Sequence, residues 1–314
     1  MSEPTLVAAG LSVETLSAPP RRQRRERLVQ RVLFVAAGVS LLISALIVFS
    51  LVREAWTFMA EVDWNLVWGD KWAPRLGEYD LKTLVVGSLI VTTIAMMLAI
   101  PCGLGSAIYL AEYASPRVRS ILKPTLEILA GVPSVVLGFF ALAWISPNIV
   151  QALFDSAGLF NLAAAGLGVG VLTIPLMASV AEDALNSVPR ELREASAGLG
   201  AKKVTTSLRV VLPAAVSGLV AAGIIGVSRA IGETMVVFIA AGGGGNVATF
   251  TVSPLDAGST MTAAMASQAS GTDSVAGEAL TFQSLFFVGL VLFVITLCLN
   301  LLAGRFVRRV REQY

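Results

Sequence analysis

Apolar residues in this chain gather into six long runs that are separated by polar segments. Each run is about as long as a helix that spans the hydrocarbon core of a bilayer. Only helices and closed barrels satisfy their own backbone hydrogen bonds in lipid, so the pattern predicts six transmembrane helices. The predicted helices cover residues 32–52, 84–110, 126–145, 162–180, 212–241 and 282–302.

Some of these runs contain residues that kink or interrupt a helix. Pro101 lies inside the second run and predicts a kink, whereas Pro213 stands near the start of the fifth, where proline is tolerated. A Gly-Val-Pro-Ser segment at 131–134 breaks the third run. The Gly-Leu-Gly-Val-Gly segment at 166–170 favours close packing of helices over nucleotide binding.

Composition supports a membrane protein and excludes several other classes. Of the 314 residues, 55% are apolar and 14% are charged, whereas a soluble domain has about 25% charged residues. The absence of histidine excludes a Ser-His-Asp triad and a His-ligated metal. Cys102 and Cys298 lie far apart in apolar runs, so no metal site or disulfide framework is expected. The net charge of +2 is too balanced to indicate a nucleic-acid partner, and the apolar composition predicts contact with membrane lipid.

Basic residues between the runs predict the topology, because Lys and Arg gather on the cytoplasmic side. The segments before the first run, after the second, after the fourth and after the sixth contain six, three, five and four basic residues. The first loop has four, and the third and fifth loops have none. This alternation predicts that both termini are cytoplasmic.

The topology divides the chain into four parts. Residues 1–30 are a predicted mobile cytoplasmic tail, and 31–80 are the first helix with an extracytoplasmic loop. Residues 81–309 are the predicted transmembrane domain, and 310–314 a cytoplasmic tail. The Arg-rich segment at 21–27 is interpreted as fixing the orientation of the first helix. That helix is interpreted as retained, because no small-residue cleavage site follows it.

The loop between the fourth and fifth runs has a pattern of its own. Ser187, Pro189 and Glu191 predict the start of a short helix, and Gly198 and Gly200 predict its end. We therefore expect a helix near 187–200 that lies across the cytoplasmic face.

The same loop contains a spaced motif of 20 residues. Its spaced positions are Glu194, Ala195, Ser196, Gly200, Val210, Leu212 and Pro213. This spacing resembles the EAA loop of ABC importer permeases, with Ser in place of the second Ala and Val in place of Ile. The resemblance implies a coupling helix that seats in a groove of an ATPase subunit, with Gly200 allowing the exit turn.

Other stretches extend the resemblance to the permeases of phosphate ABC importers. Residues 99–142, 179–203 and 227–242 are similar to that family, and the last stretch contains RAIGET. The Met-Val-Val that follows RAIGET resembles PstC-type more than PstA-type subunits, and the PstA-type subunit remains an alternative. The resemblance implies an all-α, six-helix type I ABC importer permease (MetI-like) fold in a bacterial plasma membrane.

The resemblance also implies an assembly. Its other members would be a PstA-like permease, two PstB-like ATP-binding subunits and an extracytoplasmic PstS-like phosphate-binding protein. No lysine of this chain lies in a Walker A sequence, so ATP with Mg is expected in the partner subunits. The chain itself is expected to bind no cofactor and to be no enzyme.

Arg229 and Glu233 lie inside the fifth run, where a charge costs about 2.5–3.5 kcal/mol at mid-bilayer. Their spacing predicts that the two side chains meet on one helix face. The arginine fork suits a phosphate oxyanion, and the carboxylate can accept a hydrogen bond from protonated phosphate, which sulfate cannot offer. Ser228 and Thr234 are candidate further donors. A structural ion pair is the alternative, and the RAIGET resemblance favours a substrate pathway.

Two further segments have expected roles. Ser134, after the break at 131–133, would begin a helix whose free N–H groups face an anion, or would simply end a packing kink. Residues 259–269 predict a short helix on the outer face that touches the binding protein.

The function that best combines these features is import of inorganic phosphate by an ATP-driven transporter, with this chain as a permease subunit. The nearest alternative is the same fold importing sulfate, molybdate or another anion. An ion-gradient-driven transporter and a membrane scaffold or sensor are alternatives from other classes, and the EAA loop disfavours both.

Overall fold

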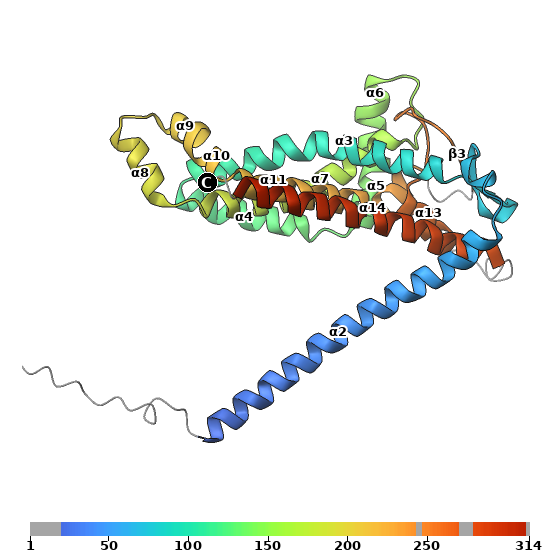
Figure 1. The fold of residues 1–314 in the computed structure, drawn as a ribbon. Helices are drawn as coiled ribbons and strands as arrows, with labels where there is room; N and C mark the ends of the chain where they lie inside the picture. The colour runs from blue at the N-terminus through green and yellow to red at the C-terminus, as the bar shows by residue number, and fades with distance from the viewer. Residues whose placement is uncertain (1–19, 243–246, 270–278, 312–314) are drawn as a thin grey trace, which may run out of the picture. The chain divides into compact units, whose positions relative to one another are not determined.

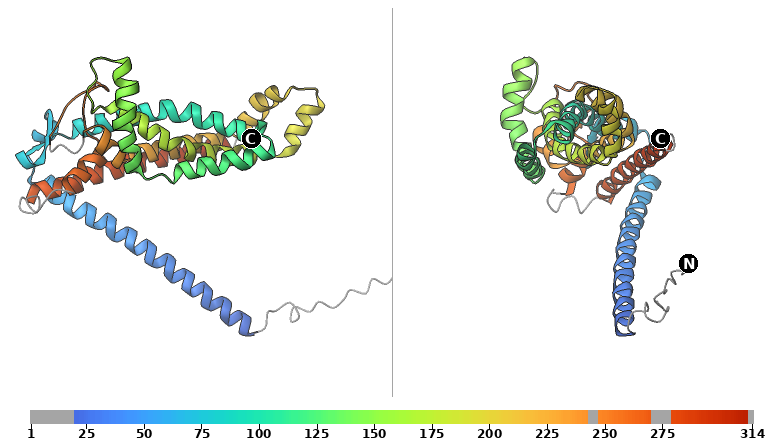
Figure 2. Two further views of the ribbon diagram at one scale, coloured as in Figure 1. Left: turned by 180° about the vertical axis from the view of Figure 1, so that it is seen from behind. Right: turned by 90° about the vertical axis from the view of Figure 1, so that its left-hand side faces the viewer.

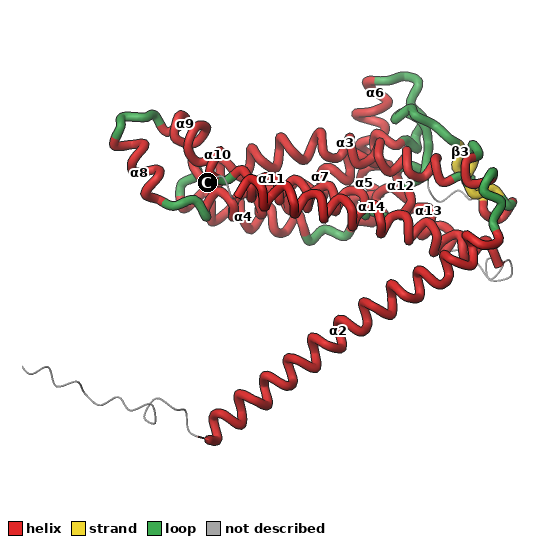
Figure 3. The backbone as a smooth tube through the Cα atoms, viewed as in Figure 1, coloured by secondary structure: helices red, strands yellow, loops and turns green. Residues whose placement is uncertain are grey.

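A computed structural model describes residues 20–242, 247–269 and 279–311, and most of them are helical (Figures 1 and 3). The predicted tails at 1–19 and 312–314 lie outside the described residues. The chain divides into two units, Met1–Arg53 and Glu54–Tyr314, and each is described by itself.

The first unit contains most of helix α2 (Pro20–Glu61). The helix begins at Pro20, before the predicted start at residue 32, so the Arg-rich segment forms its first turns. Most of its large apolar side chains between residues 28 and 52 are exposed. A surface this apolar is suited to lipid or to another membrane helix.

The second unit is a bundle centred on two long helices, α3 (Leu81–Ile108) and α7 (Leu162–Asn186). Helix α11 (Val216–Ile231) packs on both of them, and α14 (Ala279–Arg311) packs on α11 (Figures 1 and 2). Asp80 caps the start of α3, and Asn161 caps the start of α7, each through a side-chain oxygen that accepts backbone N–H groups.

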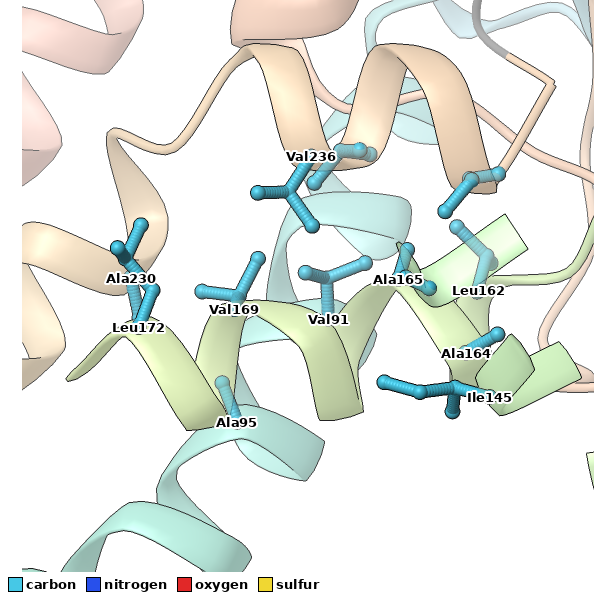
Figure 4. Packing of buried hydrophobic residues seen from close by; sticks show 14 of the residues in the cluster. Val91, Ala95, Ile145, Leu162, Ala164, Ala165, Val169, Leu172, Ala230 and Val236 are labelled. Carbon is cyan, nitrogen blue, oxygen red and sulfur yellow. The ribbon is translucent and has the colours of Figure 1, made fainter. Parts of the chain in front are cut away.

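Small residues bring the central helices into close contact. Figure 4 shows Val91 of α3, Val169 of α7 and Val236 of α12 (Met235–Ala240) meeting in the main core cluster. A Cβ added at Gly166 would lie 2.7 Å from the Cβ of Ile94, which is closer than packed atoms approach. The glycine segment at 166–170 therefore serves helix packing, as its position in an apolar run predicts.

The third predicted helix is wrong in its bounds, because the chain breaks at 131–133. Helix α4 (Pro116–Ala130) ends there, and α5 (Ser134–Phe140) continues through a π-helical segment, η4 (Ala141–Val150), into α6 (Gln151–Leu153). Pro133 has no N–H to donate and disfavours helix in the residue before it. The apolar helix of membrane-spanning length is therefore Ser134–Leu153.

The fifth predicted helix is also interrupted, at two places. Helices Lys203–Ala214 and Val216–Ile231 meet at a bend of 72° beside Pro213, and residues 232–234 separate α11 from α12. Five described helices are long and apolar enough to cross a membrane, or up to six if the bent pair is one span. The six predicted spans agree with the larger number.

A small antiparallel sheet of order β2-β1-β3 stands at one end of the bundle, opposite the end that carries α8 (Figures 1 and 3). Its strands are β1 (Lys71–Ala73), β2 (Glu78–Tyr79) and β3 (Ala248–Thr249), and two 3₁₀ turns, η1 (Leu66–Trp68) and η2 (Pro74–Leu76), flank β1. Trp72 of β1 pairs with Tyr79 and with Ala248. This end encloses a second core cluster around Phe58 and Phe287.

Helix α13 (Met261–Ala269) lies between α12 and α14. The predicted short helix at 259–269 is therefore present, but its expected position on the outer face is wrong. Six of its nine residues are buried, because small and hydroxyl side chains let the helix enter the bundle. The buried residues are Met261, Thr262, Ala263, Ala264, Ser267 and Gln268.

Candidate functional site

Arg229 and Glu233 meet at the break between α11 and α12. Nη2 of Arg229 lies 3.7 Å from Oε2 of Glu233, so the predicted pair forms. The prediction of a shared helix face is wrong, because α11 ends at Ile231 and Glu233 follows Gly232 in the non-helical break. The Glu233 side chain is 5% exposed and that of Arg229 is 49% exposed. The carboxylate is therefore enclosed, and the guanidinium keeps donors that face outward from this chain.

The three other predicted pathway residues are not bonded to this pair. The hydroxyl of Ser228 donates to Oδ1 of Asn300 in α14 at 3.1 Å. The hydroxyl of Thr234 faces the carbonyl of Gly232 at 3.4 Å. Ser134 is half-buried at the start of α5, which packs on α12. Within the described ranges, only Arg229 and Glu233 are brought together.

The predicted coupling helix is α8 (Arg190–Gly198). Pro189 occupies its N-cap position, whereas Ser187 ends α7 and its hydroxyl donates to the carbonyl of Ala184, so the predicted Ser187 cap is wrong. The helix ends at Gly198 as predicted, and Gly200 has a φ of +77°. That backbone conformation suits glycine and makes the exit turn. Glu194 and Ala195 are exposed on α8.

Ser196 explains the departure from the EAA pattern. Its buried hydroxyl lies 2.8 Å from the hydroxyl of Thr206 in α9 (Lys203–Thr206). A serine at this position therefore has a hydrogen-bond partner and joins the two short helices of the loop. The chain then passes through a π-helical segment, η5 (Ser207–Val211), into α10 (Leu212–Ala214), which contains the predicted re-entry residues Leu212 and Pro213.

Arg193 fastens α8 to the bundle, a role that the sequence did not reveal. Its guanidinium donates to Glu112 at 2.9 Å and to the carbonyls of Leu185 and Val188 at 2.8 and 2.6 Å. Glu112 lies in a π-helical turn, η3 (Tyr109–Tyr113), that follows α3. The coupling helix is therefore tied to the ends of both central helices. A lone carboxylate at the end of an apolar run was the available signal for Glu112.

Glu182 is a second charged residue that the sequence did not single out. It is buried in α7 and pairs with Arg119 and, at 3.3 Å, with Nζ of Lys123, both from α4. The pairs hold α4 against α7 near the end that carries α8. In residues 20–242, 247–269 and 279–311, no three His, Cys, Asp or Glu side chains come together as a metal site would require.

A cavity of about 630 Å³ lies beside these pairs. Glu112, Arg119, Arg190, Arg193, Glu194 and Lys203 contribute its charged lining. The exposed residues of this lining can contact a partner protein, whereas Arg193 and Glu112 form an ion pair with each other.

Comparison with known proteins identifies the family. The family model described as binding-protein-dependent transport system inner membrane component matches residues 99–312. The chain belongs to this family. Its members are transport permease subunits of the inner membrane, which accords with the apolar helices of the bundle.

Curated relatives carry related names. The probable ABC transporter permease protein YqgH of Bacillus subtilis (strain 168) is 32% identical over 79% of this chain and 77% of its own. The phosphate transport system permease protein PstC of Pasteurella multocida (strain Pm70) is 29% identical over 89% of this chain and 90% of its own. PstC 1 of Mycobacterium tuberculosis (strain ATCC 25618 / H37Rv) is 32% identical over 74% and 73%.

A solved structure has the same fold. It is an inward-facing conformation of the MetNI methionine ABC transporter, with a TM-score of 0.54 and 21% sequence identity. The match covers 71% of this chain and 93% of that chain. The predicted MetI-like fold is therefore confirmed.

Proposed function

We propose that this chain is a PstC-type permease subunit through which an ATP-driven importer moves inorganic phosphate across a bacterial plasma membrane. The EAA spacing on α8, the MetI-like fold and the similarity to proteins named PstC support the proposal. The assignment of phosphate as the substrate rests on one observation, the Arg229–Glu233 pair at a helix break inside the fifth span.

Arg229 provides the attraction for the anion. Its side chain is half exposed and, among the residues that the structure describes, makes a single long contact with Glu233, which leaves most of its five N–H donors for phosphate oxygens. A charge at this depth of a membrane protein is costly unless it faces a partner, an ion or a water-filled path. A transported oxyanion meets that requirement and can leave again, because Glu233 competes for the same guanidinium.

Glu233 provides the discrimination between anions. Phosphate near neutral pH still carries a proton that it can donate to a carboxylate, whereas sulfate carries none. A sulfate oxygen would face the Glu233 carboxylate without a hydrogen and would be repelled. A hydrogen bond that involves a charged group contributes about 1.5–3 kcal/mol, which corresponds to roughly tenfold to hundredfold discrimination. For Ser228 and Thr234 to add donors, each would have to give up its present hydrogen bond, to Asn300 and Gly232 respectively, and Ser134 lies apart in α5.

The assembly we propose contains a second, PstA-like permease, two PstB-like ATP-binding subunits and an extracytoplasmic PstS-like phosphate-binding protein. ATP and Mg would be used by the ATP-binding subunits. Glu194 and Ala195 on α8, and Gly200 in the turn after it, are exposed and suit a docking surface for one of the ATP-binding subunits. The Lys and Arg bias of the loops supports cytoplasmic termini.

The coupling step follows from what α8 contacts. Closure of the ATP-binding subunits would displace α8, which Arg193 ties to the ends of α3 and α7. On its other side, α8 continues through α9 and the 72° bend into α11, which bears Arg229. Displacement of α8 would therefore change the position of α11 against the central helices and switch access to the pair.

Uptake by the reconstituted complex tests this proposal. We expect ATP-dependent uptake of radiolabelled phosphate that persists in excess sulfate and is lost in Arg229→Ala. The control is Arg117→Ala, which removes an exposed arginine at the start of α4 and should leave uptake unchanged. Uptake that sulfate abolishes would indicate a general oxyanion permease. Uptake that survives Arg229→Ala would assign the arginine a structural role.

A further inference from the structure

The segment before α13 enters the bundle beside α3. A Cβ added at Gly87 of α3 would lie 2.2 Å from the carbonyl oxygen of Ser259, so no larger residue fits there without displacing the segment. The backbone N–H of Met261 donates to the hydroxyl of Ser88 at 3.0 Å. The first turn of α13 is therefore fixed against α3 by one close approach and one buried hydrogen bond.

The same turn contacts the backbone of Glu233. The hydroxyl of Thr262 donates to the carbonyl oxygen of Glu233 at 2.7 Å, and this contact is buried. The hydroxyl of Thr260 lies 3.1 Å from that of Thr262 and accepts the N–H of Ala263 at 3.3 Å. Thr260 thus holds the Thr262 hydroxyl in place while it bonds to the helix break.

The backbone of Glu233 needs a hydrogen bond from another segment to fix it, because this residue lies outside both α11 and α12. Its own N–H donates to the carbonyl of Ala230 at 3.3 Å, and Gly232 before it has no side chain to restrict the backbone. The direction of the Glu233 carboxylate depends on the backbone conformation of this residue. A short hydrogen bond to its carbonyl therefore limits where the carboxylate can lie relative to Arg229.

We propose that Thr262 is a positioning residue for Glu233, and that it thereby sets the preference of the permease for protonated phosphate. This inference rests on the proposed function. Thr262 does not touch the anion, and its effect passes through the backbone of Glu233. The segment continues outward to β3, which pairs with β1, so Glu233 is held by an element anchored at the sheet end of the bundle.

Thr262→Val tests the proposal, because valine has the shape of threonine without the hydroxyl. Thr262→Ser keeps the hydroxyl and should behave as the wild type. The matched control is Thr281→Val, since the buried Thr281 hydroxyl also donates to a backbone carbonyl, that of Pro74, at 3.0 Å. Pro74 lies in η2 beside the sheet and away from the break.

The readout is binding of phosphate and of sulfate to the assembled complex of permeases and ATP-binding subunits, measured without the binding protein. We expect Thr262→Val to lower the ratio of phosphate to sulfate affinity by about tenfold, as loss of one hydrogen bond in the anion contact would. Thr262→Ser and Thr281→Val should keep the ratio of the wild type. Thermal unfolding of each complex verifies that the variants fold.

Three results would overturn the inference: a wild-type ratio in a folded Thr262→Val complex, an equal loss in Thr281→Val, or no recovery in Thr262→Ser. If the Thr262→Val complex fails to fold, Thr260→Val is the second variant, because it leaves the Thr262 hydroxyl in place but removes the hydroxyl that holds it and that accepts the N–H of Ala263. Arg229→Ala in the same assay separates the two proposals. If Arg229→Ala abolishes phosphate binding and Thr262→Val has no effect, the pathway stands and the positioning role fails. If Arg229→Ala binds phosphate normally, the proposed substrate pathway at Arg229 fails, and the positioning role fails with it.

Discussion

Charged residues of the bundle lie in two regions, beside α8 and at the break between α11 and α12. The two regions differ in how fully these charges are paired. Beside α8, Arg193 donates four hydrogen bonds to Glu112 and to two carbonyl groups, and the buried Glu182 is paired with two cations. At the helix break, Arg229 makes one contact of 3.7 Å with Glu233 and is half exposed.

The difference supports our proposal that Arg229 is a functional charge, whereas Arg193 and Glu182 are structural ones. A buried charge with all its hydrogen bonds satisfied fixes the elements that it joins, and it is strongly destabilising to lose one partner. Arg229 has most of its donors unused in the described part of the chain, and it belongs to an apolar run that is predicted to span the membrane, where an unpaired charge is costly. We therefore interpret the region beside α8 as a rigid mechanical joint and the break as a place where an anion passes.

The largest effect on stability is expected from Arg193→Ala. It would leave the enclosed Glu112 carboxylate and two helix-end carbonyls without their donor, at a cost of about 3 kcal/mol. Thermal unfolding of the assembled complex measures this loss. Arg190→Ala, an exposed position on the same helix, is the control and should leave the unfolding temperature unchanged. An equal fall in unfolding temperature in Arg193→Ala and Arg190→Ala would contradict the structural role of Arg193.

Arg229→Ala should reduce transport and leave stability nearly unchanged, in contrast to Arg193→Ala. We expect transport to fall by about 100-fold, as loss of charge-assisted hydrogen bonds to the anion would produce, with little change in unfolding temperature. Uptake and thermal unfolding, measured on the same preparation, test the expected loss of transport and the expected unchanged stability. A variant that transports normally but unfolds at lower temperature would place Arg229 with the structural charges.

Glu233→Gln should change selectivity more than rate. The amide keeps the size of the side chain but removes the charge that repels sulfate and accepts the proton-bearing oxygen of phosphate. We expect the preference for phosphate over sulfate to narrow by about tenfold. Competition binding to the assembled complex measures the change. An unaltered preference would mean that Glu233 only restrains Arg229.

Gly200→Ala should have the smallest effect. Its φ of +77° strains any residue with a Cβ, at a cost of about 1 kcal/mol, although no neighbouring atom would clash. We expect a modest loss in the uptake achieved per ATP hydrolysed, because the exit turn of the coupling loop is distorted. Gly198→Ala is the control, since that position is helical and equally open. Equal uptake per ATP hydrolysed in the two variants would show that the positive φ of Gly200 is not the cause of the loss.

The sequence predicts those features that depend on local pattern. Apolar length gave the spans, and motif spacing gave the coupling helix with its end at Gly198. The break at 232–234 escaped prediction because an apolar run does not show whether a glycine inside it ends the helix. The segment at 131–134 was visible as a break, but its effect on the bounds of the third span was not.

Long-range contacts could not be read from the sequence. Arg193 and Glu112 are 81 residues apart, and Thr262 and Glu233 are 29 apart, so no periodicity links them. The small, hydroxyl-rich α13 has a composition that suits either an exposed helix or a tightly packed one. Only the close approach of Gly87 to Ser259 decides that it enters the bundle.

The most direct test of the central claim is phosphate binding to the assembled permease complex, without the binding protein, in wild type and Arg229→Ala. The account predicts that the variant loses phosphate binding while its unfolding temperature stays that of the wild type. Retained phosphate binding together with a lowered unfolding temperature would contradict it, because Arg229 would then be a structural charge like Arg193.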